Sequence, residues 1–157
     1  MERRPTREPM PAHSESRVVP YTADLMFRVV ADVERYPEFV PWCVALRILK
    51  RETVGPRDIL LCETVVGFKG LRERYTSRAT LIARDHHIDV ENVEGVFRKL
   101  ETHWRFTPDG EGCRIDFDIA FEFKSRMLAA VANTAFALVI TRMTHAFEER
   151  ARRLNAS

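Results

Sequence analysis

Residues 125–155 read SRMLAAVANTAFALVITRMTHAFEERARRLN and contain neither proline nor glycine. Apolar side chains recur in this stretch at the three- and four-residue spacing of a single helix face. They are Leu128, Ala132, Phe136, Val139, Met143, Phe147 and Leu154. Ser125 has the short hydroxyl side chain that commonly caps a helix. The pattern therefore predicts one helix of roughly 45 Å at about 1.5 Å per residue, and such a helix needs a broad apolar surface to lie on.

The opposite face of this helix changes from apolar to charged along its length. The charged part consists of Arg142, Glu149, Arg152 and Arg153. Before it, the face carries Met127, Val131 and Leu138, and no charged residue occurs from Met127 to Thr141. A helix that is apolar all round is normally covered all round. We therefore expect this outward patch to be covered by the protein itself, to form a homodimer contact, or to be a docking surface.

The composition is that of an ordinary globular protein. The chain has 157 residues, of which 45% are hydrophobic and 31% charged, and its net charge is +2. This charge is too small to indicate nucleic-acid binding by itself, and the longest uncharged run, about 15 residues, is too short to span a bilayer. The N-terminus lacks the apolar core of a signal peptide. We expect a mobile tail at residues 1–12, one domain at residues 13–157, and a location in the cytoplasm.

Most of the remaining chain has the pattern of strands. Residues 13–19 predict a strand that ends at Pro20, and Thr22 caps a helix that we expect to stop before Pro37. Six further strands are predicted at residues 44–53, 59–66, 72–82, 86–93, 100–107 and 113–124. The last strand alternates apolar and polar residues, which indicates one buried and one solvated face. Strands and helices do not alternate after residue 43, so the sequence predicts an α+β fold with a curved antiparallel sheet against the long helix.

A curved sheet around a straight helix leaves space between them, because the two surfaces cannot touch everywhere. The side chains expected around this space are Trp42, Phe97, Trp104, Phe106, Phe117, Phe121 and Phe136. An apolar cavity of this kind suits an apolar ligand, and a filled core made by the same residues is the alternative. The turn at residues 36–43, YPEFVPWC, is either a lid over that core or a wall of the cavity.

The sequence contains no motif for catalysis or metal binding. It has no nucleophile elbow, phosphate loop or HExxH motif. The histidines at positions 13, 86, 87, 103 and 145 lack metal-like spacing, and we expect them on the solvated surface together with Asp116, Asp118 and Glu122. The cysteines at positions 43, 62 and 113 are isolated, which favours free thiols. We predict no catalytic and no metal-binding residue.

Several segments of the chain resemble a known family. They are Tyr36-Pro37-Glu38-Phe39-Val40-Pro41-Trp42-Cys43, Phe97-Arg98-Lys99-Leu100 with Trp104-Arg105-Phe106, Cys113, Phe121-Glu122-Phe123 and Ala146-Phe147-Glu148-Glu149-Arg150-Ala151. With them, residues 13–154 resemble the coenzyme Q-binding, START-like family of the polyketide cyclase/dehydrase and lipid-transport superfamily, whose bacterial members include ribosome association toxin A. Val96 departs from the family pattern, which often has proline at that position.

The resemblance implies a helix-grip fold of the START and Bet v 1 type, in which a seven-stranded antiparallel sheet grips the C-terminal helix. It also implies a non-catalytic protein that holds ubiquinone or a similar polyprenyl lipid in support of respiration, without a covalent cofactor. We expect the ligand to contact Phe39, Val40, Trp42, Phe97, Trp104, Phe106, Phe117, Phe121, Ala132, Phe136, Val139 and Met143. A carrier must also meet the membrane, and we expect peripheral contact with the inner membrane through Phe68, Lys69, Met127, Val131 and Leu138.

Two alternative functions are open on the sequence. The family also implies a ribosome-binding toxin that blocks subunit association, and the basic residues Arg72, Arg74 and Arg78 on one strand are its local support. These arginines equally fit an ordinary solvated strand face. Related folds include polyketide cyclases and aromatases, but the sequence shows no convergent acid–base pair for the predicted cavity.

Overall fold

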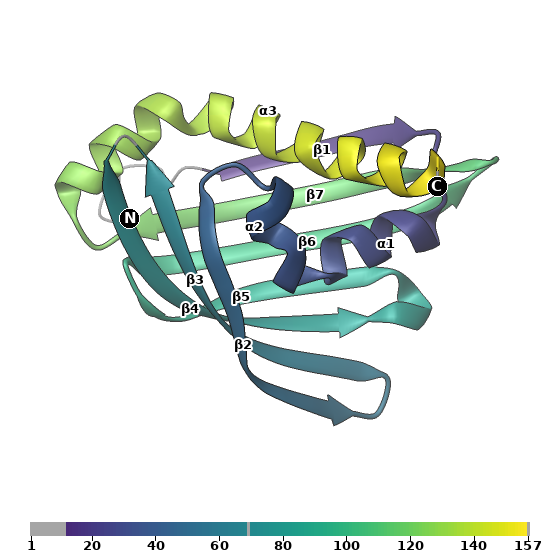
Figure 1. Ribbon diagram of the computed structural model, residues 1–157, viewed down its shortest axis with the longest axis horizontal. Coiled ribbons are helices and arrows are strands. Elements are labelled where there is room, and N and C mark those ends of the chain that lie inside the picture. The colour runs from purple at the N-terminus through teal and green to yellow at the C-terminus, as the bar shows by residue number, and fades with distance from the viewer. Residues whose placement is uncertain (1–11, 69, 157) are drawn as a thin grey trace, which may run out of the picture.

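Seven strands form one antiparallel sheet in the computed structural model, which describes residues 12–68 and 70–156 (Figure 1). The strands are β1 (Ala12–Val19), β2 (Cys43–Val54), β3 (Arg57–Phe68), β4 (Leu71–Ile82), β5 (His87–Gly95), β6 (Phe97–Asp109) and β7 (Gly112–Phe123). Their order across the sheet is β1-β7-β6-β5-β4-β3-β2. Strands that follow one another in the chain from β2 to β7 are neighbours in the sheet. β1 pairs with β7 and forms one edge of the sheet, and β2 forms the other edge. The predicted α+β helix-grip architecture is confirmed.

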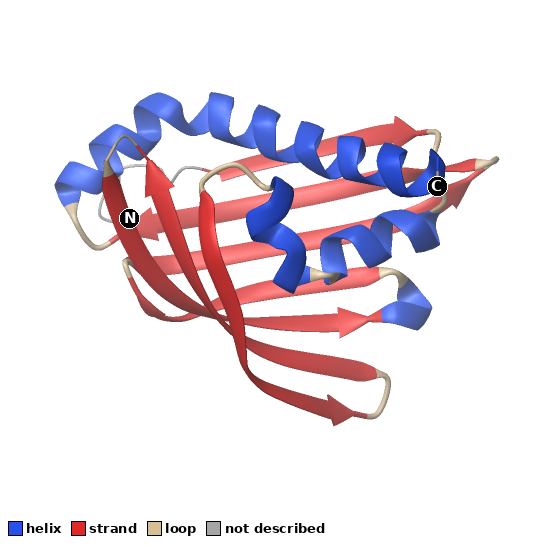
Figure 2. Cartoon of the chain, viewed as in Figure 1, coloured by secondary structure: helices blue, strands red, loops and turns tan. Residues whose placement is uncertain are grey.

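A short 3-10 helix, Ala83–Asp85, connects β4 to β5, and the three α-helices all lie on one side of the sheet, as Figure 2 shows in blue. They are α1 (Ala23–Ala31), the short α2 (Tyr36–Phe39) and the long α3 (Arg126–Ala156). The opposite, convex face of the sheet carries the polar positions of each strand, because side chains alternate between the two faces. In β6, for example, Thr102 and Trp104 are buried, whereas His103 between them is exposed.

The sheet bends around the helices, and irregular pairing marks several of the bends. The register shifts between Ile48 and Lys50 in β2, between Thr76 and Ser77 in β4, and between Phe97 and Lys99 in β6. An extra residue in one strand kinks that strand and increases its local twist. These shifts therefore help to curve the sheet away from a flat packing against α3.

The long helix begins and ends close to the predicted limits. The backbone N–H of Leu128 donates to the hydroxyl of Ser125 at 3.3 Å, which confirms the predicted N-cap. Before Ile140, none of the described side chains of α3 is fully buried, whereas Phe147 and Ala151 beyond it are. Leu154 was expected on the buried face but is 44% exposed, because it lies in the last turn, past the edge of the core.

The second half of α3 is fastened to the rest of the molecule by polar contacts as well. Arg17 of β1 places a guanidinium nitrogen 2.7 Å from a carboxylate oxygen of Glu148. On length and composition alone, α3 is long and apolar enough to cross a membrane. The expectation that no segment is long enough, which counted only the uncharged run of about 15 residues, was therefore too strict. In this fold the helix lies lengthwise over the sheet instead (Figure 1).

The segment between α1 and β2 differs from its prediction. Thr22 caps α1 as expected, since its hydroxyl accepts the backbone N–H of Leu25 at 3.1 Å. However, α1 ends at Ala31, and Tyr36, which precedes Pro37, adopts helical angles and begins α2. Proline in the first turn of a helix loses no hydrogen bond, and Tyr36 is held in place because its hydroxyl donates to the carbonyl of Val30.

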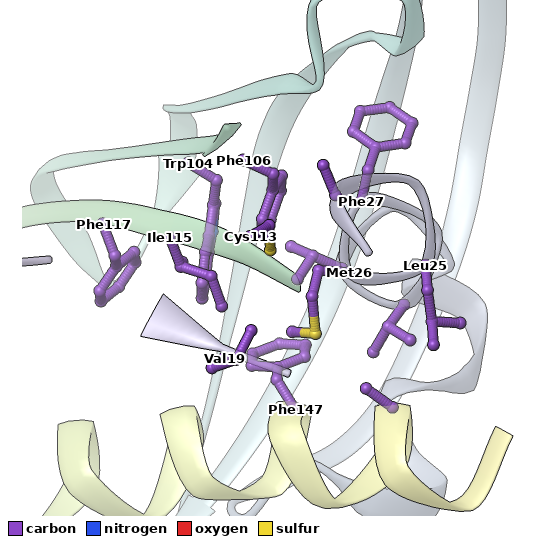
Figure 3. Close-up of a cluster of buried hydrophobic side chains, with 14 of the residues drawn as sticks. Val19, Leu25, Met26, Phe27, Trp104, Phe106, Cys113, Ile115, Phe117 and Phe147 are labelled. Carbon is purple, nitrogen blue, oxygen red and sulfur yellow. The ribbon is translucent and has the colours of Figure 1, made fainter. Parts of the chain in front are cut away.

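A solid hydrophobic core fills the end of the molecule where α1 and the second half of α3 meet the sheet. Figure 3 shows Met26 of α1 and Phe147 of α3 pointing toward each other beside the aromatic residues of β6 and β7. Trp104 and Phe117 pack with their ring centroids 4.1 Å apart. Of the predicted N-terminal tail, residues 1–11 lie outside the described residues, and Ala12 already belongs to β1.

Candidate functional site

An apolar cavity of about 350 Å³ lies between α3, from Leu128 to Phe147, and the concave face of the sheet. Side chains from α1 and α2, from the turn between them, from β2 to β7 and from α3 line it. The helix contributes Leu128, Val131, Ala132, Ala135, Phe136, Val139, Ile140, Met143 and Phe147. The volume falls in the range of about 300–1,000 Å³ that is usual for small-molecule sites. The prediction that the sheet and the helix leave space between them is confirmed. Some lining residues, such as Trp104 and Phe117, also belong to the core cluster packed against α1.

Ten of the twelve predicted ligand-contacting residues line this cavity. They are Val40, Trp42, Phe97, Trp104, Phe117, Phe121, Ala132, Phe136, Val139 and Met143. They come from α3, from the adjacent strands β6 and β7, and from the connection between α2 and β2. Their contact with a ligand stays a prediction, but the structure gathers them around one apolar space.

Phe39 and Phe106 lie outside the lining of the cavity. The rings of Phe39 and Phe147 pack edge to face with centroids 5.7 Å apart, and the guanidinium carbon of Arg150 lies over the Phe39 ring, 5.2 Å from its centroid. Phe106 is 1% exposed and packs edge-on against Phe27 of α1. Both were predicted as ligand contacts because Phe39 shares a motif, and Phe106 a strand face, with residues that do line the cavity. Phe106 is separated from the cavity because α1 covers the end of β6 that carries it.

Trp42 forms a wall of the cavity in an unusual backbone conformation. Its φ angle is +67°, a left-handed value that bulky residues rarely adopt. The conformation is held by the hairpin between β3 and β4: the backbone N–H of Gly67 donates to the Trp42 carbonyl at 2.9 Å, and the rings of Trp42 and Phe68 lie 5.8 Å apart. Of the two interpretations of this turn, the structure therefore supports a cavity wall, tied to the β3–β4 hairpin.

The cavity wall reaches solvent near the same hairpin. Leu71, at the start of β4, lines the cavity and is nevertheless 38% exposed. Phe68 also lines the cavity. Lys69, predicted as a membrane contact together with Phe68, lies outside the described residues.

The outward patch predicted on α3 is only partly outward. Met127 is 68% exposed and Leu138 is 48% exposed, in agreement with the prediction. Val131 instead lines the cavity. It follows Leu128 by three residues and precedes Ala135 by four, so it lies beside the inner stripe, at the border between the two faces of the helix. Met127 and Leu138 therefore remain as the large exposed apolar side chains on the outer face of the uncharged half.

A set of polar side chains inside the cavity was missed by the sequence reasoning. They are Thr64, Glu73, Tyr75, Ser77 and Thr102. Thr64 and Tyr75 are direct partners in the β3–β4 ladder, and their side chains are hydrogen-bonded to each other. The alternation of β3 and β4 carried the signal, because Cys62, Thr64 and Val66 share one face of β3, and Glu73, Tyr75 and Ser77 share one face of β4.

The polar groups of the cavity are suited to hydrogen bonding and poorly suited to proton transfer. Burial raises the pKa of Tyr75 to about 12, and burial raises the pKa values of the lining thiols Cys43 and Cys62 to about 11. These groups therefore stay protonated and neutral at physiological pH. Among the described lining residues, Glu73 is the one carboxylate and no histidine is present, so the paired acid and base that general acid–base catalysis uses are not assembled here.

The loop that departs from the expected family pattern keeps its place beside the cavity. The backbone N–H of Val96 donates to the carbonyl of Arg74 at 3.3 Å, a hydrogen bond that proline could not make. The next residue, Phe97, is 8% exposed and lines the cavity. Valine is therefore accommodated in this loop by a bond to the neighbouring strand.

The comparisons with known proteins agree with this architecture. Residues 19–148 match the family model described as polyketide cyclase/dehydrase and lipid transport. The chain is 36% identical over 147 residues to coenzyme Q-binding protein COQ10 homolog B, mitochondrial, of Xenopus laevis, and the match covers 90% of this chain but 58% of that protein. It is 32% identical over 146 residues to the ribosome association toxin RatA of Rickettsia prowazekii, covering 91% of this chain and 97% of that protein.

Solved structures give the same result. The solution structure of the 18 kDa protein CC1736 from Caulobacter crescentus matches with a TM-score of 0.78 and 35% identity, over 94% of this chain and all of that one. A START superfamily protein from Mycobacterium smegmatis matches with a TM-score of 0.74 at 22% identity, over 91% of this chain and 98% of that one, which shows the fold alone. The resemblance inferred from the sequence motifs is thus confirmed, and the chain belongs to the polyketide cyclase/dehydrase and lipid transport family.

Proposed function

We propose that this protein binds ubiquinone or a similar polyprenyl lipid in the cavity under α3 and carries it without chemical change, in support of respiratory electron transport. The observation that carries the proposal is the cavity itself: an apolar space walled by aromatic side chains, with neutral hydroxyl groups along one side. An isoprenoid tail requires the first feature and a quinone ring, whose carbonyl oxygens accept hydrogen bonds, uses the second. The names of the coenzyme Q-binding relatives in Xenopus laevis and Drosophila melanogaster support the same choice.

The two kinds of wall suggest how the ligand lies. Thr64, Tyr75 and Ser77 present hydroxyl groups from β3 and β4, and we assign the quinone head to this wall. Phe121 and Phe136, whose rings are 5.1 Å apart, belong to the aromatic wall between β7 and α3, along which the tail extends. Burying the tail against these rings supplies most of the affinity, at roughly 25 cal/mol per Å² of apolar surface.

A carrier of this kind loads and unloads at a membrane. We place the protein in the cytoplasm, with its docking surface at the solvent-open end of the cavity. Leu71 there, and Met127 and Leu138 on α3, are exposed apolar side chains suited to contact with an interface.

The proposal is tested by the content of the purified protein. Full-length protein isolated from a quinone-producing host is expected to release a quinone or another polyprenyl lipid at near-stoichiometric amounts on extraction with organic solvent. Adding a short-chain ubiquinone to the delipidated protein is expected to quench tryptophan fluorescence, because Trp42 and Trp104 both line the cavity. Protein that carries no lipid, and whose fluorescence does not respond to quinone, would contradict the proposed function.

Ribosome association is the second candidate function. The observation in its favour is that this chain matches the RatA proteins of Rickettsia prowazekii and Escherichia coli over 97% and 88% of their lengths. Arg72 and Arg74 are exposed on β4, while Arg78 is engaged by Glu91 at 3.0 Å. If this function holds, the protein sediments with ribosomal subunits at physiological salt, and replacing Arg72 and Arg74 by glutamine weakens the association. Absence of co-sedimentation would remove this candidate.

A cyclase or aromatase function is not favoured. The Zhui aromatase/cyclase from Streptomyces sp. R1128 has the same fold, with a TM-score of 0.72 over 92% of this chain and 94% of that one, but at 21% identity the likeness reaches no further. Glu73 lines the cavity without a histidine or a second carboxylate among the described lining residues. A cavity without a positioned acid and base is better suited to holding a molecule than to converting it.

A further inference from the structure

Two histidines and one aspartate converge on the convex face of the sheet. Nε2 of His87 lies 2.7 Å from Oδ1 of Asp89, and Nδ1 of His103 lies 2.5 Å from the same oxygen. The three potential ligand atoms all lie within 4.8 Å of one another. His87 and His103 were expected as separate surface histidines, because sixteen positions divide them in the chain; the pairing of β5 with β6 brings them together.

The positions of these side chains follow from the strand register. Asp89 is the direct partner of His103 across the β5–β6 ladder, and His87 lies two residues before Asp89 on the same face. The side chains between them point to the other face, where Ile88 and Trp104 line the cavity. The cluster is therefore held by two hydrogen-bonded strands and is separated from the lipid cavity by the thickness of the sheet.

The donor set is that of a transition-metal site. Imidazole nitrogen and carboxylate oxygen are the ligands that zinc and its neighbours in the periodic table take, with bonds of about 2.0–2.2 Å. In a tetrahedral site such bonds place the ligand atoms roughly 3.3 Å apart. The two nitrogen–oxygen distances of 2.7 and 2.5 Å are shorter than this value and all three atoms lie within 4.8 Å of one another, so the side chains must separate slightly to admit the ion. On metal binding, each imidazole gives up its hydrogen bond to Asp89 and coordinates through the same nitrogen, and any proton on that nitrogen is released to solvent.

The charges around the cluster include both signs. Burial opposes ionisation of Asp89, but hydrogen bonds from His103 and His87 outweigh it and hold the pKa of the carboxyl below its ordinary value. The register places Arg105 opposite His87 and Asp118 opposite His103 on the β7 side. Arg105 opposes a bound cation, but it pairs across the β6–β7 ladder with Asp116. The pKa of Asp116 is lowered chiefly by a hydrogen bond from Ser16, and also by Arg114 and Arg105. Asp118 adds a second carboxylate on the open side of His103.

We propose that His87, Asp89 and His103 bind a divalent transition-metal ion, zinc being the best match, on the convex face of the sheet. Three protein ligands leave at least one position for water. The ion links β5 to β6 where their ladder is short, since pairing covers His87 to Glu91, five of the nine residues of β5. Bound metal therefore stabilises the sheet behind the cavity, whether or not a lipid is present.

The test uses full-length, tag-free protein treated with a chelator and dialysed. Calorimetric titration with zinc chloride is expected to show one site per chain, and cobalt(II) is expected to give the visible absorption of a low-coordinate site. His103→Gln and Asp89→Asn each remove one ligand, and we expect zinc affinity to fall by more than about tenfold. His145→Gln, which removes an exposed histidine from α3, is the matched control and is expected to bind zinc as the wild type does.

Thermal unfolding supplies a second readout that a nonspecific surface site would not give. Zinc is expected to raise the Tm of the wild type and of His145→Gln, because it binds the folded state, and to raise the Tm of His103→Gln clearly less at the same zinc concentration. The Tm values without metal show that each variant is folded. Zinc binding of equal strength in His103→Gln and His145→Gln, or no zinc binding by the wild type, would overturn the proposal.

Discussion

Replacing Ala132 by tryptophan is expected to abolish lipid retention while leaving the chain folded. Ala132 lies on the inner face of α3 and contributes to the cavity lining beside the Phe97, Leu100 and Phe121 cluster. An indole at this position projects into the space that we assign to the isoprenoid tail. We expect the extracted quinone to fall below about one tenth of the wild-type amount, which corresponds to a loss of at least roughly 1.4 kcal/mol in binding free energy.

The control for this variant is Ala137→Trp. Ala137 is on the same helix but is exposed, so the substitution has the same cost in helix propensity, roughly 0.5 kcal/mol, without entering the cavity. Urea unfolding of the delipidated proteins reports whether the indole finds free space: a filled core would be destabilised by about 1–3 kcal/mol through overpacking, whereas the cavity accommodates it. Equal lipid content in the two variants would show that the lipid lies elsewhere, even if the wild type carries one.

The order of elements and the face of each strand were predictable from the sequence because both depend on local periodicity. The alternation of β7 and the helical spacing of α3 follow directly from their apolar residues, and the structure confirms both. Tyr36 was mispredicted, since a local rule on residues before proline was outweighed by the tertiary contacts of its ring and hydroxyl. Val131 was misplaced because it lies near the border of two faces, where sequence spacing alone does not assign a side.

The aromatic residues of the candidate site were predictable from the sequence, whereas its polar residues were not. Large apolar residues on a strand face indicate an inner surface, but a cavity and a filled core use the same residues, and only the three-dimensional path of α3 separates them. Phe106 and Phe117 illustrate the limit: both are on inner strand faces, and α1 covers the first while the second lines the cavity. The polar groups are harder still, because Thr64 and Tyr75 become a pair only through the register of β3 and β4.

The interior combines a packed core next to α1 with a cavity under α3, an arrangement that allows one small domain to fold stably and to hold the proposed ligand. Phe147 and Ala151 anchor the second half of α3 in the core. The first half of α3 has no fully buried side chain before Ile140, and it places small side chains such as Ala132 and Ala135 over the cavity. A ligand that fills this space replaces the missing contacts, so lipid binding is expected to stabilise the first half of α3 more than the second.

Replacing Gly95 by alanine is expected to cause a large loss of stability and to disturb the polar wall of the cavity. Gly95 has a φ angle of +119°, and a Cβ atom there would lie 2.6 Å from the carbonyl oxygen of Arg74 and 2.6 Å from the Cα atom of Tyr75. The unfavourable backbone conformation costs about 1–3 kcal/mol, and the clash with backbone atoms adds about 1–3 kcal/mol as in an overpacked core. We expect the free energy of unfolding to fall by roughly 2–6 kcal/mol in total.

Gly110→Ala separates the two causes, because Gly110 has a positive φ angle of +59° but nothing within 4 Å of the added Cβ atom. This variant is expected to lose only about 1–2 kcal/mol, the cost of a left-handed conformation for alanine. Gly95 pairs with Tyr75 across the β4–β5 ladder, so relief of the clash must move the strand that carries the Tyr75 hydroxyl. Quinone affinity should therefore fall in Gly95→Ala and stay unchanged in Gly110→Ala. Urea unfolding measures the loss of stability in both variants, and fluorescence titration measures their quinone affinity. Equal losses of stability in the two variants would show that the close approach at Gly95 is absent in solution.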